Sequence, residues 1–569
     1  MADPVRLVEL RVLDGPNLYF TRPAIKLTLA VPGWLRAGDE RVTAVAGRLG
    51  LSSGTRAGPP QSDQRRRLVA RIAAHLARRM AVAGGARRLS VRARPGPERD
   101  QIVVAFPWRR RAAAESLANE VTAGMSALLR RSPDRLIAES GRRLAGVVPG
   151  DVPAVPDPDI PVVQVTGTNG KTTTVRLLAH MVRTAGLRVA YSSTDGVYRD
   201  DDELVEAGDY SGFGGAARAL AQRPDIAVLE TARGGMLLRG VGVQHNDVAV
   251  VTNVSEDHLG LHGVDTVDQL AEVKSIVTRI TRPGGWDVLN ADDPRALAMR
   301  RHASGRPWLF TTDPDHPAIR EVLSEGGRAI TVLDDRLCWL ERRQTHPLVP
   351  VVDVPVTLAG ISRTNLQNAM AATAAALAIG LPERAVVRGL RSFVLDPERN
   401  PGRTNLFGID GRIVVIDYAH NEAGMMGLTE VLNGLRRRGR EIWLAICTAG
   451  DRTDAILHAF AFRAAVASDH LAVVELLHYL RGRTREDIDE RLREGAREAG
   501  VDDVPVYDDE LTALRSMLAR SGRGDVIGVT ALGMRPEIFA WLAAQGAERL
   551  TPVDVRRLVR QARTSRSSS

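Results

Sequence analysis

Lysine is almost absent from this sequence of 569 residues. Of its 77 basic residues, three are lysine (Lys26, Lys171 and Lys274) and 74 are arginine. A general drift towards arginine explains the 74 but not where lysine was kept, because Lys171 closes a glycine-containing loop and Lys274 follows Asp257-His258 within one helix-like segment. An ammonium group is compact and can lose its proton, whereas a guanidinium is planar and stays charged. The two positions therefore indicate chemistry that arginine does not provide.

Cysteines and long apolar runs are scarce as well. Cys338 and Cys447 lie far apart in apolar, strand-like segments, which argues against a disulfide framework and against a cysteine metal site. The sequence has no run of about 18 apolar residues and no signal-peptide pattern at its start, so we expect no membrane span and a cytoplasmic protein. Hydrophobic residues make up 44% of a chain too long for one core, which predicts several domains.

Positive charge is concentrated in residues 1–150. This segment has 27 basic and 12 acidic residues, a net charge of +15, which leaves −6 for the rest of a chain of total charge +9. Such a block suits nucleic acid, an acidic polymer or an anionic substrate, or it is simply an arginine-rich solvated surface. Because aromatic residues are sparse, we do not expect nucleic acid, and we keep an acidic peptide polymer as a candidate partner.

The apolar pattern predicts an α/β protein of three domains. Residues 1–150 alternate strands and helices as in a small α+β domain, and four prolines before residue 162 mark a linker. Strands and helices alternate through 160–395 as in a doubly wound parallel sheet, and again through 396–548 as in a Rossmann-like domain. We expect the tail 549–569 to be partly disordered. The main helices are expected at 64–82, 112–131, 172–185, 266–281 and 364–379, and an antiparallel insertion at 328–357.

A glycine loop follows the buried-type strand 162–166. Its sequence is Gly167-Thr168-Asn169-Gly170-Lys171-Thr172-Thr173, and a helix is expected directly after it. Small residues let backbone N–H groups approach a phosphate, the helix N-terminus adds positive potential, and the Thr172 hydroxyl can bind Mg²⁺. With a strand before and a helix after, this pattern favours phosphate binding over a structural turn.

Polar residues end the next two buried strands. Glu230 ends one of them, where it either shares Mg²⁺ with Thr172 or caps a helix. Asn253 ends the other, and His258 follows as either a metal ligand or a satisfied polar contact. Lys274 is either part of this site or a surface lysine on the helix 266–281.

Together these motifs resemble the Mur ligases, a family that forms amide bonds with ATP. The resemblance covers about 160–545 and includes Asn365-Leu366-Gln367-Asn368, Gly402-Arg403 and Asp417-Tyr418-Ala419-His420-Asn421. A narrower resemblance, to the ligase part of cyanophycin synthetases, rests on Ser193-Thr194-Asp195-Gly196, Glu230-Thr231-Ala232-Arg233-Gly234-Gly235 and Leu289-Asn290-Ala291-Asp292-Asp293, and more weakly on Gly15-Pro16-Asn17. The ATP-grasp domain of those enzymes is missing between the basic domain and the glycine loop. Glu422 also departs from the family, which usually has proline there.

The resemblance implies a ligase that activates a carboxylate as an acyl phosphate, which an amino acid or another amine then attacks. It implies ATP and two Mg²⁺ ions as cofactors, a small-molecule or peptide carboxylate as the acid, and a homo-oligomer. The implied catalytic residues are Lys171, His258, Lys274 and Arg403. The implied nucleotide ligands are Gly167, Thr168, Asn169, Gly170, Lys171, Thr172, Thr173, Asn368 (adenine), Arg403 (phosphates) and Asp417 (ribose or hinge). The implied metal ligands are Thr172, Glu230, His258 and Lys274.

In many Mur ligases the lysine that corresponds to Lys274 is carbamylated, so the resemblance implies that modification here. Gly450-Asp451-Arg452 resembles a family turn that could hold the amine, although an ordinary strand-to-helix cap explains it equally well.

Two further function classes stay open: a nucleotide-binding regulatory or scaffold protein without turnover, and an ATPase associated with a polyanion. The joint presence of Lys171, Glu230, His258 and Lys274 argues against the scaffold, which needs only the phosphate loop.

Overall fold

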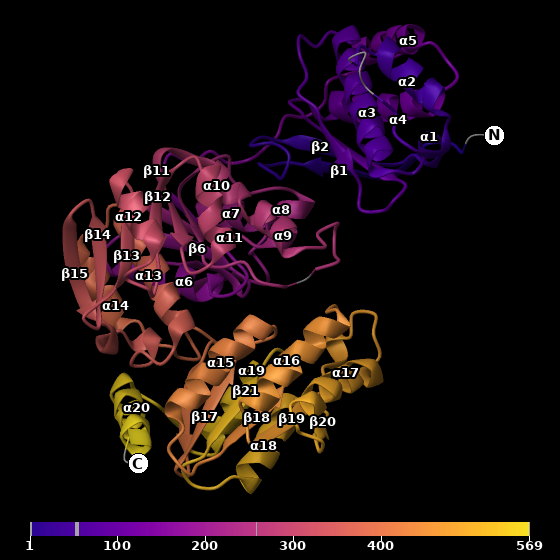
Figure 1. Ribbon diagram of the computed structural model, residues 1–569. Coiled ribbons are helices and arrows are strands. Elements are labelled where there is room, and N and C mark those ends of the chain that lie inside the picture. Colours follow the sequence, from indigo (N-terminus) through magenta and orange to yellow (C-terminus); the bar gives the residue numbers. More distant parts are fainter. Residues whose placement is uncertain (1–2, 52–55, 258, 568–569) are drawn as a thin grey trace. The chain divides into compact units, whose positions relative to one another are not determined.

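The computed structural model describes residues 3–51, 56–257 and 259–567 (Figure 1). The chain divides into two compact units. The first holds the residues up to Asp159 with the segments Ser211–Ala217 and Thr231–His245, and the second holds the remaining residues. Both units combine sheets with helices, which confirms the mixed α/β class expected from the sequence.

The first unit is built on a four-stranded antiparallel sheet. Its elements are β1 (Arg6–Leu13), β2 (Ala24–Ala30), α1 (Pro32–Arg36), α2 (Asp39–Arg48), α3 (Asp63–Ala83), β3 (Arg92–Pro95), β4 (Gln101–Pro107), α4 (Arg111–Ala127) and α5 (Pro133–Ala145). The strand order is β1-β2-β4-β3, and α3 packs against β3, β4, α4 and α5. Leu27 of β2 and Leu76 and Met80 of α3 are buried in one apolar core, so the amphipathic face of α3 covers the sheet.

The turn between β1 and β2 is fastened to a segment that is distant in sequence. The side-chain oxygen of buried Asn17 accepts two backbone N–H groups of the turn. The Gly15 N–H donates to the Arg239 carbonyl, and the Val241 N–H donates to the Pro16 carbonyl. A Cβ atom on Gly15 would lie 1.8 Å from the Val241 carbonyl oxygen, so only glycine allows this approach. These contacts explain why the segment Thr231–His245 belongs to the first unit.

The central sheet of the second unit has eleven strands in the order β15-β14-β13-β12-β11-β10-β5-β9-β6-β7-β8. The strands from β13 to β6 in this order are parallel, and the outer strands at both ends are antiparallel. The strands are β5 (Val162–Thr166), β6 (Val189–Ser193), β7 (Gly196–Arg199), β8 (Glu203–Ala207), β9 (Ile226–Glu230), β10 (Asn246–Val251), β11 (Thr281–Asn290), β12 (Arg306–Phe310), β13 (Arg328–Leu333), β14 (Arg336–Glu341) and β15 (Gln344–Pro350). The last three form the antiparallel insertion expected at 328–357.

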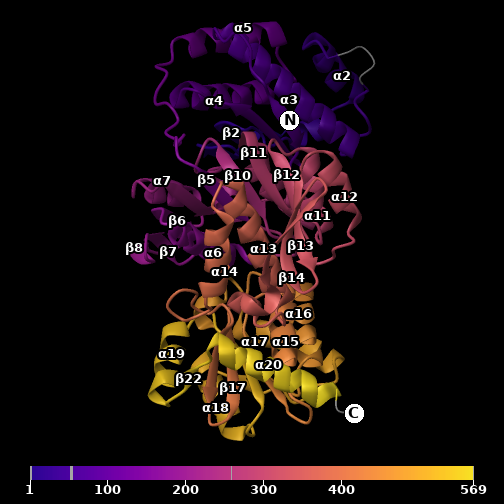
Figure 2. The ribbon, with the colours of Figure 1, turned by 90° about the vertical axis from the view of Figure 1, so that its left-hand side faces the viewer.

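β5 lies near the middle of this sheet. The helices of this part of the sequence are α6 (Lys171–Thr184), α7 (Phe213–Leu220), α8 (Arg233–Leu238), α9 (Val267–Lys274), α10 (Ile276–Arg279), α11 (Pro294–Ala298), α12 (Pro317–Ser324), α13 (Arg363–Ala378) and α14 (Glu383–Ser392); α8 and the start of α7 belong to the first unit. α6 contacts β5, β6 and β9 on one side and α13 and α14 on the other (Figure 2). The carboxyl ends of β5, β9 and β10 therefore meet beside the start of α6, where ligands bind in such sheets.

The C-terminal part of the second unit contains a second, seven-stranded sheet. Its strand order is β20-β19-β18-β21-β17-β16-β22, with antiparallel pairing at β17-β16-β22 and parallel pairing elsewhere. The elements are β16 (Asn405–Ile409), β17 (Arg412–Asp417), α15 (Glu422–Leu435), β18 (Ile442–Ile446), α16 (Asp454–Val466), β19 (His470–Val474), α17 (Arg485–Glu498), β20 (Val506–Tyr507), α18 (Glu510–Arg520), β21 (Val526–Thr530), α19 (Arg535–Ala544), β22 (Glu548–Arg549) and α20 (Pro552–Ser567). This arrangement agrees with the expected Rossmann-like pattern.

Two expectations about helices were wrong. The tail expected to be partly disordered forms α20, which packs on α15; the Arg438 N–H donates to the Ser565 hydroxyl and the Arg566 guanidinium donates to the Asn433 carbonyl. Val559 and Ala562 of this helix form a buried apolar stripe, which is too narrow to be recognised from the composition of the segment. The helix expected at 266–281 is interrupted at Ser275, between α9 and α10. No helix among the described residues is both long and apolar enough to span a membrane.

Candidate functional site

The glycine loop connects β5 to α6 in a backbone conformation that requires its two glycines. Gly167 has φ +151° and Gly170 has φ +85°, both in the region that favours glycine. A Cβ atom on Gly167 would lie 1.8 Å from the Thr252 hydroxyl oxygen, and one on Gly170 would lie 2.1 Å from the Asn368 side-chain oxygen. The loop is therefore packed closely between neighbouring segments and leads into the N-terminus of a long helix, where backbone N–H groups attract anions.

The end of β10 holds this loop in place. The Asn169 N–H donates to the Asn253 side-chain oxygen at 2.9 Å, and the Asn253 side-chain nitrogen donates to the Asn169 carbonyl at 3.1 Å. The Thr252 hydroxyl also donates to that carbonyl, and the Thr168 N–H donates to the Asn253 carbonyl. Asn253 thus holds the loop in place through hydrogen bonds. The sequence indicated only that Asn253 ends a buried strand.

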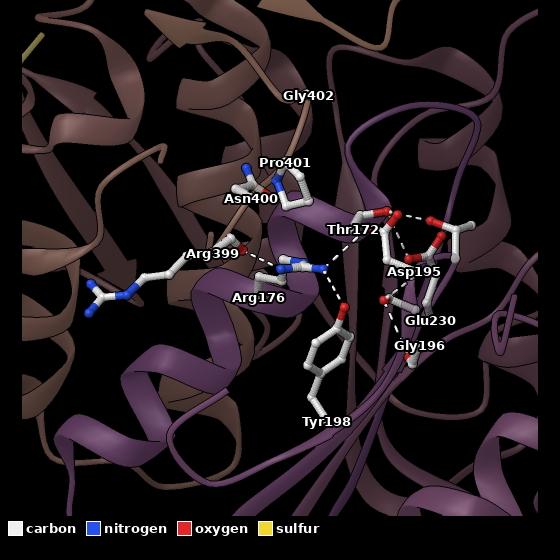
Figure 3. Close-up of polar contacts among 12 residues, drawn as sticks. Thr172, Arg176, Asp195, Gly196, Tyr198, Glu230, Arg399, Asn400, Pro401 and Gly402 are labelled. Carbon is white, nitrogen blue, oxygen red and sulfur yellow. Dashed lines mark hydrogen bonds and ion pairs between the residues drawn. The ribbon is translucent and has the colours of Figure 1, made fainter. Parts of the chain in front are cut away.

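Glu230, the last residue of β9, contacts Thr172 near the start of α6. The Thr172 hydroxyl donates to Glu230 Oε2 at 2.9 Å, and the Glu230 side chain is 2% exposed (Figure 3). Among the described residues, Oε1 of Glu230 has no hydrogen-bond partner. Burial raises the pKa of the Glu230 carboxyl, while the charges of Lys171 and Arg403 and the bond from Thr172 lower it. A buried carboxylate with one unused oxygen beside a hydroxyl is suited to a hard cation.

Lys274 lies at the same loop and is not a surface residue. It ends α9, a helix whose N-terminus is fixed by a capping box between Thr266 and Gln269. Its side chain is 3% exposed, and its Nζ donates to the Gly167 carbonyl at 2.6 Å. The alternative of a plain surface lysine was therefore wrong.

Lys171 and Asn368 complete the surroundings of the loop. The Lys171 Nζ donates to the Thr168 carbonyl at 3.0 Å, which places the ammonium over the loop itself. Asn368 is buried on α13, where its side-chain nitrogen donates to the Asn365 side-chain oxygen at 3.1 Å while its oxygen faces Gly170. The structure thus brings Lys171, Thr172, Glu230, Lys274 and Asn368 together around one loop.

Arg403 and Asp417 come from the C-terminal part of the chain. The Arg403 guanidinium lies 4.4 Å from the centre of the Tyr418 ring, and its charge lowers the pKa values of Glu230 and Asp417 against the effect of burial. The Thr404 hydroxyl donates to Asp417 Oδ2 at 2.8 Å. The charge of Arg403 therefore acts on both the Glu230 and the Asp417 carboxylates, and its contact with phosphates stays a prediction.

His258, expected as a metal ligand, lies outside the described residues. Its neighbour Asp257 pairs with the buried Arg452, whose Nη2 is 3.1 Å from Asp257 Oδ1. Asp451, beside Arg452 in the Gly450-Asp451-Arg452 turn, pairs with Arg481 at 2.6 Å. The turn, for which an amine site and a strand-to-helix cap were equally open, thus carries ion pairs in the described structure, and its role stays a prediction. No group of three or more His, Cys, Asp or Glu side chains arranged for a metal occurs among the described residues.

Asn421 connects the loop to the C-terminal part. Its side-chain oxygen caps α15 by accepting the Gly424 N–H at 2.8 Å, so Glu422 in place of proline leaves this helix start regular. The side chains of Asn169 and Asn421 exchange hydrogen bonds of 3.1 and 3.2 Å.

Arg176, which lies one turn beyond the loop, was not predicted from the sequence as a functional residue. Its guanidinium is 2% exposed and bonds Asp195, Tyr198 and the Arg399 carbonyl (Figure 3). The sequence does contain a signal for Arg176: it stands between Val175 and Leu177 on an apolar helix, and an arginine buried there needs partners for its charge.

Family comparisons agree with this geometry. Residues 165–376 match the Mur ligase middle domain, and residues 402–533 match the Mur ligase glutamate ligase domain. Over 343 residues the chain is 38% identical to a cyanophycin synthetase of Synechocystis sp., which covers 60% of this chain but 38% of that enzyme. It is 29% identical to a UDP-N-acetylmuramyl-tripeptide synthetase of Deinococcus radiodurans, over 73% of this chain and 79% of that one.

A solved bifunctional folylpolyglutamate synthase/dihydrofolate synthase with bound Mn, AMPPNP and L-glutamate shares the fold. Its TM-score is 0.50 at 19% identity, covering 67% of this chain and 89% of that chain. The chain spans about two fifths of the length of the curated cyanophycin synthetases it matches. Because both domain models are matched in sequence order and together extend over most of the chain, this protein belongs to the Mur ligase family.

Proposed function

We propose that this protein is an ATP-dependent amide ligase that activates a carboxylate as an acyl phosphate and couples it to an amino acid or another amine. The observation that carries this proposal is the hydrogen-bonded pair of Thr172 and Glu230 beside the glycine loop, in which the buried Oε1 of Glu230 has no partner among the described residues. Lys274 is buried against the same loop. The relatives are named as synthetases, one of them of a tripeptide, and as ligases of D-glutamate or 2,6-diaminopimelate, which supports the same reaction class.

The residues present fit ATP and a divalent cation. The two glycines let the loop pack against Thr252 and Asn368, where a Cβ atom would collide, and the carboxylate and hydroxyl oxygens are the ligands that Mg²⁺ prefers. In the proposal Thr172 and Glu230 hold one ion, and His258 with carbamylated Lys274 holds a second. When bound, Mg²⁺ neutralises phosphate charge and polarises the phosphoryl group.

The protein itself acts mainly by positioning and by charge. Lys171 and the loop N–H groups orient the phosphates, and Arg403 neutralises charge that develops as the acyl phosphate forms. The amine nitrogen then attacks the acyl carbon, and phosphate leaves from the tetrahedral intermediate. Asn368 contacts adenine, Asp417 contacts the ribose or acts at the hinge between the two parts of the second unit, and we expect a homo-oligomer.

Two other functions remain weaker candidates. A scaffold without turnover has no use for a lysine buried against the phosphate loop. An ATPase associated with a polyanion needs the basic first unit and a Mg²⁺ site such as Thr172–Glu230, but it does not need Lys274 buried at Gly167. The half-reaction of the ATP-grasp domain in cyanophycin synthetases is not part of the proposal, because the basic segment leads through 148–158, which has no regular secondary structure, into β5.

The test is a phosphate-release screen of paired acids and amines, with mass spectrometry of the products. We expect phosphate release that needs ATP, Mg²⁺, an acid and an amine together, and a product heavier than the acid by the amine less water. Glu230→Gln, which keeps the hydrogen bond from Thr172 but loses the charge, serves as the inactive control. Release stimulated by a polyanion alone, with no condensation product, would favour the ATPase instead.

A basic groove in the first unit supports an acidic peptide as the acid substrate. It has a volume of about 680 Å³ and lies beside the C-terminal half of α3; its arginines are Arg22, Arg78, Arg87, Arg88 and Arg92. Arg92 stacks on Phe20 at 5.3 Å, and Arg78 donates to the Val91 carbonyl, so parts of the wall are fixed. In the described structure no carboxylate lies within ion-pair distance of Arg87 or Arg88.

We therefore expect Arg87→Ser/Arg88→Ser to weaken binding of a fluorescent oligo-aspartate about tenfold at low salt, because each exposed pairing is modest and screened. Arg67→Ser/Arg71→Ser removes the same charge from an exposed face of α3 outside the groove and is the matched control. Fluorescence anisotropy of the whole chain measures both. Equal losses in the two variants would show that net charge, and not the groove, attracts the peptide.

A further inference from the structure

Asp195 lies in the turn between β6 and β7 and bonds two arginines from different parts of the second unit. One carboxylate oxygen is 3.2 Å from Nη2 of Arg176 on α6, and the other is 3.5 Å from Nη1 of Arg535 at the start of α19. The Asp195 N–H donates to the Ser193 hydroxyl, which fixes the turn, and the side chain is 16% exposed (Figure 3). One carboxylate thus links the helix of the phosphate loop to the C-terminal sheet.

The first arginine, Arg176, joins α6 to the segment 393–404, which lies between α14 and β16 and is called the linker below. Besides Asp195, the Arg176 guanidinium bonds the Tyr198 hydroxyl at 3.3 Å and the carbonyl of Arg399 (Figure 3). It lies five residues after Lys171 on the same helix. Burying a guanidinium without partners costs free energy of folding. Separation of Arg176 from these partners is therefore unfavourable, and the contacts hold α6, β7 and the linker together.

The second arginine crosses the same linker. Arg535 Nη1 donates to the Pro401 carbonyl at 3.2 Å, and Gly402, with φ +68°, leaves room where a Cβ atom would lie 2.6 Å from Arg535 Cδ. The buried Glu510 carboxylate accepts the three backbone N–H groups of 532–534, which fixes the loop that presents Arg535. Arg535 therefore holds the linker against a rigid part of the C-terminal sheet.

Tyr418 connects this linker to the site. Its ring lies 5.2 Å from the Arg535 guanidinium and 4.4 Å from that of Arg403. Arg403 is itself part of the linker, because its N–H donates to the Asn400 carbonyl. The position of Arg403 thus depends on Arg535, and Arg535 is paired with Asp195.

We propose that Asp195 is a positioning residue that fixes the linker and, through Arg535 and Tyr418, places Arg403 at the phosphate loop. The inference rests on the proposed ligase reaction for its kinetic consequence only. The geometric consequence, a C-terminal domain held in one position relative to the phosphate loop, is measurable without turnover.

The kinetic test compares Asp195→Asn with Asp202→Asn. Asp202 also pairs with an arginine of α6, Arg183, at 2.7 Å, and it accepts a hydrogen bond from Tyr191 on β6 of the same sheet, so it is a matched control. We expect Asp195→Asn to lower kcat about 100-fold, because the misplacement reaches a charge near the phosphates, with little change in KM for ATP. Asp202→Asn should change kcat less than about threefold. Asp195→Glu, which keeps the charge, should recover part of the loss.

The geometric test uses spin labels on Val352→Cys and Val466→Cys, two exposed positions on the two sides of the linker; the native Cys338 and Cys447 are buried. With a non-hydrolysable ATP analogue, we expect a narrow distance distribution in the natural sequence and in Asp202→Asn, and a broader one in Asp195→Asn. An unchanged distribution in folded Asp195→Asn, or equal kcat losses in both variants, overturns the proposal. Absence of turnover in every chain refutes the ligase function but leaves the distance measurement decisive.

Discussion

Lys171→Arg is expected to lose about 1,000-fold in the rate of ATP-dependent phosphate release, equivalent to about 4 kcal/mol of transition-state stabilisation. The Lys171 ammonium reaches back over its own loop to the Thr168 carbonyl at 3.0 Å, a path that suits a narrow, compact cation. A guanidinium is wider and planar, so it cannot occupy that position without moving the loop, which Asn253 and Thr252 hold in place.

Lys26→Arg is the matched control for this change. Lys26 pairs with Glu9 at 2.8 Å on the sheet of the first unit, where an arginine can make the same pair, so we expect unchanged phosphate release. Phosphate release and binding of a fluorescent ATP analogue measure both variants. Lys171→Arg with nearly full activity would show that the loop needs only a positive charge, and the shape argument for the retained lysine would be wrong.

Lys274→Arg is expected to lose at least about 100-fold in activity, because arginine offers no neutral amine for CO₂ to modify. The amine is buried and 2.6 Å from the Gly167 carbonyl, so a carbamate formed on it would bring negative charge to the loop near Glu230. After incubation with ¹³C-bicarbonate, we expect a carbamate signal in the NMR spectrum of the natural chain and none in Lys274→Arg.

Lys274→Met separates this modification from simple packing. Methionine fills a similar volume but has neither the charge nor the hydrogen bond to the Gly167 carbonyl, so a lysine that only fills space would be replaced at little cost in activity. We expect Lys274→Met to fold, as checked by thermal unfolding, and to be as inactive as Lys274→Arg. An active chain that never shows the carbamate signal would exclude the modification, whatever the two variants do.

The elements around the phosphate loop were predictable because their signals are local. A run of apolar residues that ends in a glycine loop and continues as a helix specifies β5 and α6 without knowledge of the rest of the chain. The polar ends of β9 and β10 were recognised for the same reason, and parallel pairing with β5 then brings Glu230 and Asn253 to the loop. By contrast α20 was missed, because its buried stripe is narrow in a segment rich in arginine and serine.

The sequence alone determined the residue types at the loop, the reaction family that they resemble and the two positions near the loop motifs at which lysine was kept. It did not determine how deeply Lys274 is buried, because a lysine near the end of a helix reads as solvated until the partner segment is known. Nor could it reveal that Arg176, Asp195 and Arg535 meet, since 340 residues separate Asp195 from Arg535. A contact between such distant residues depends on how the helices, the linker and the two sheets pack, and only the tertiary structure decides that.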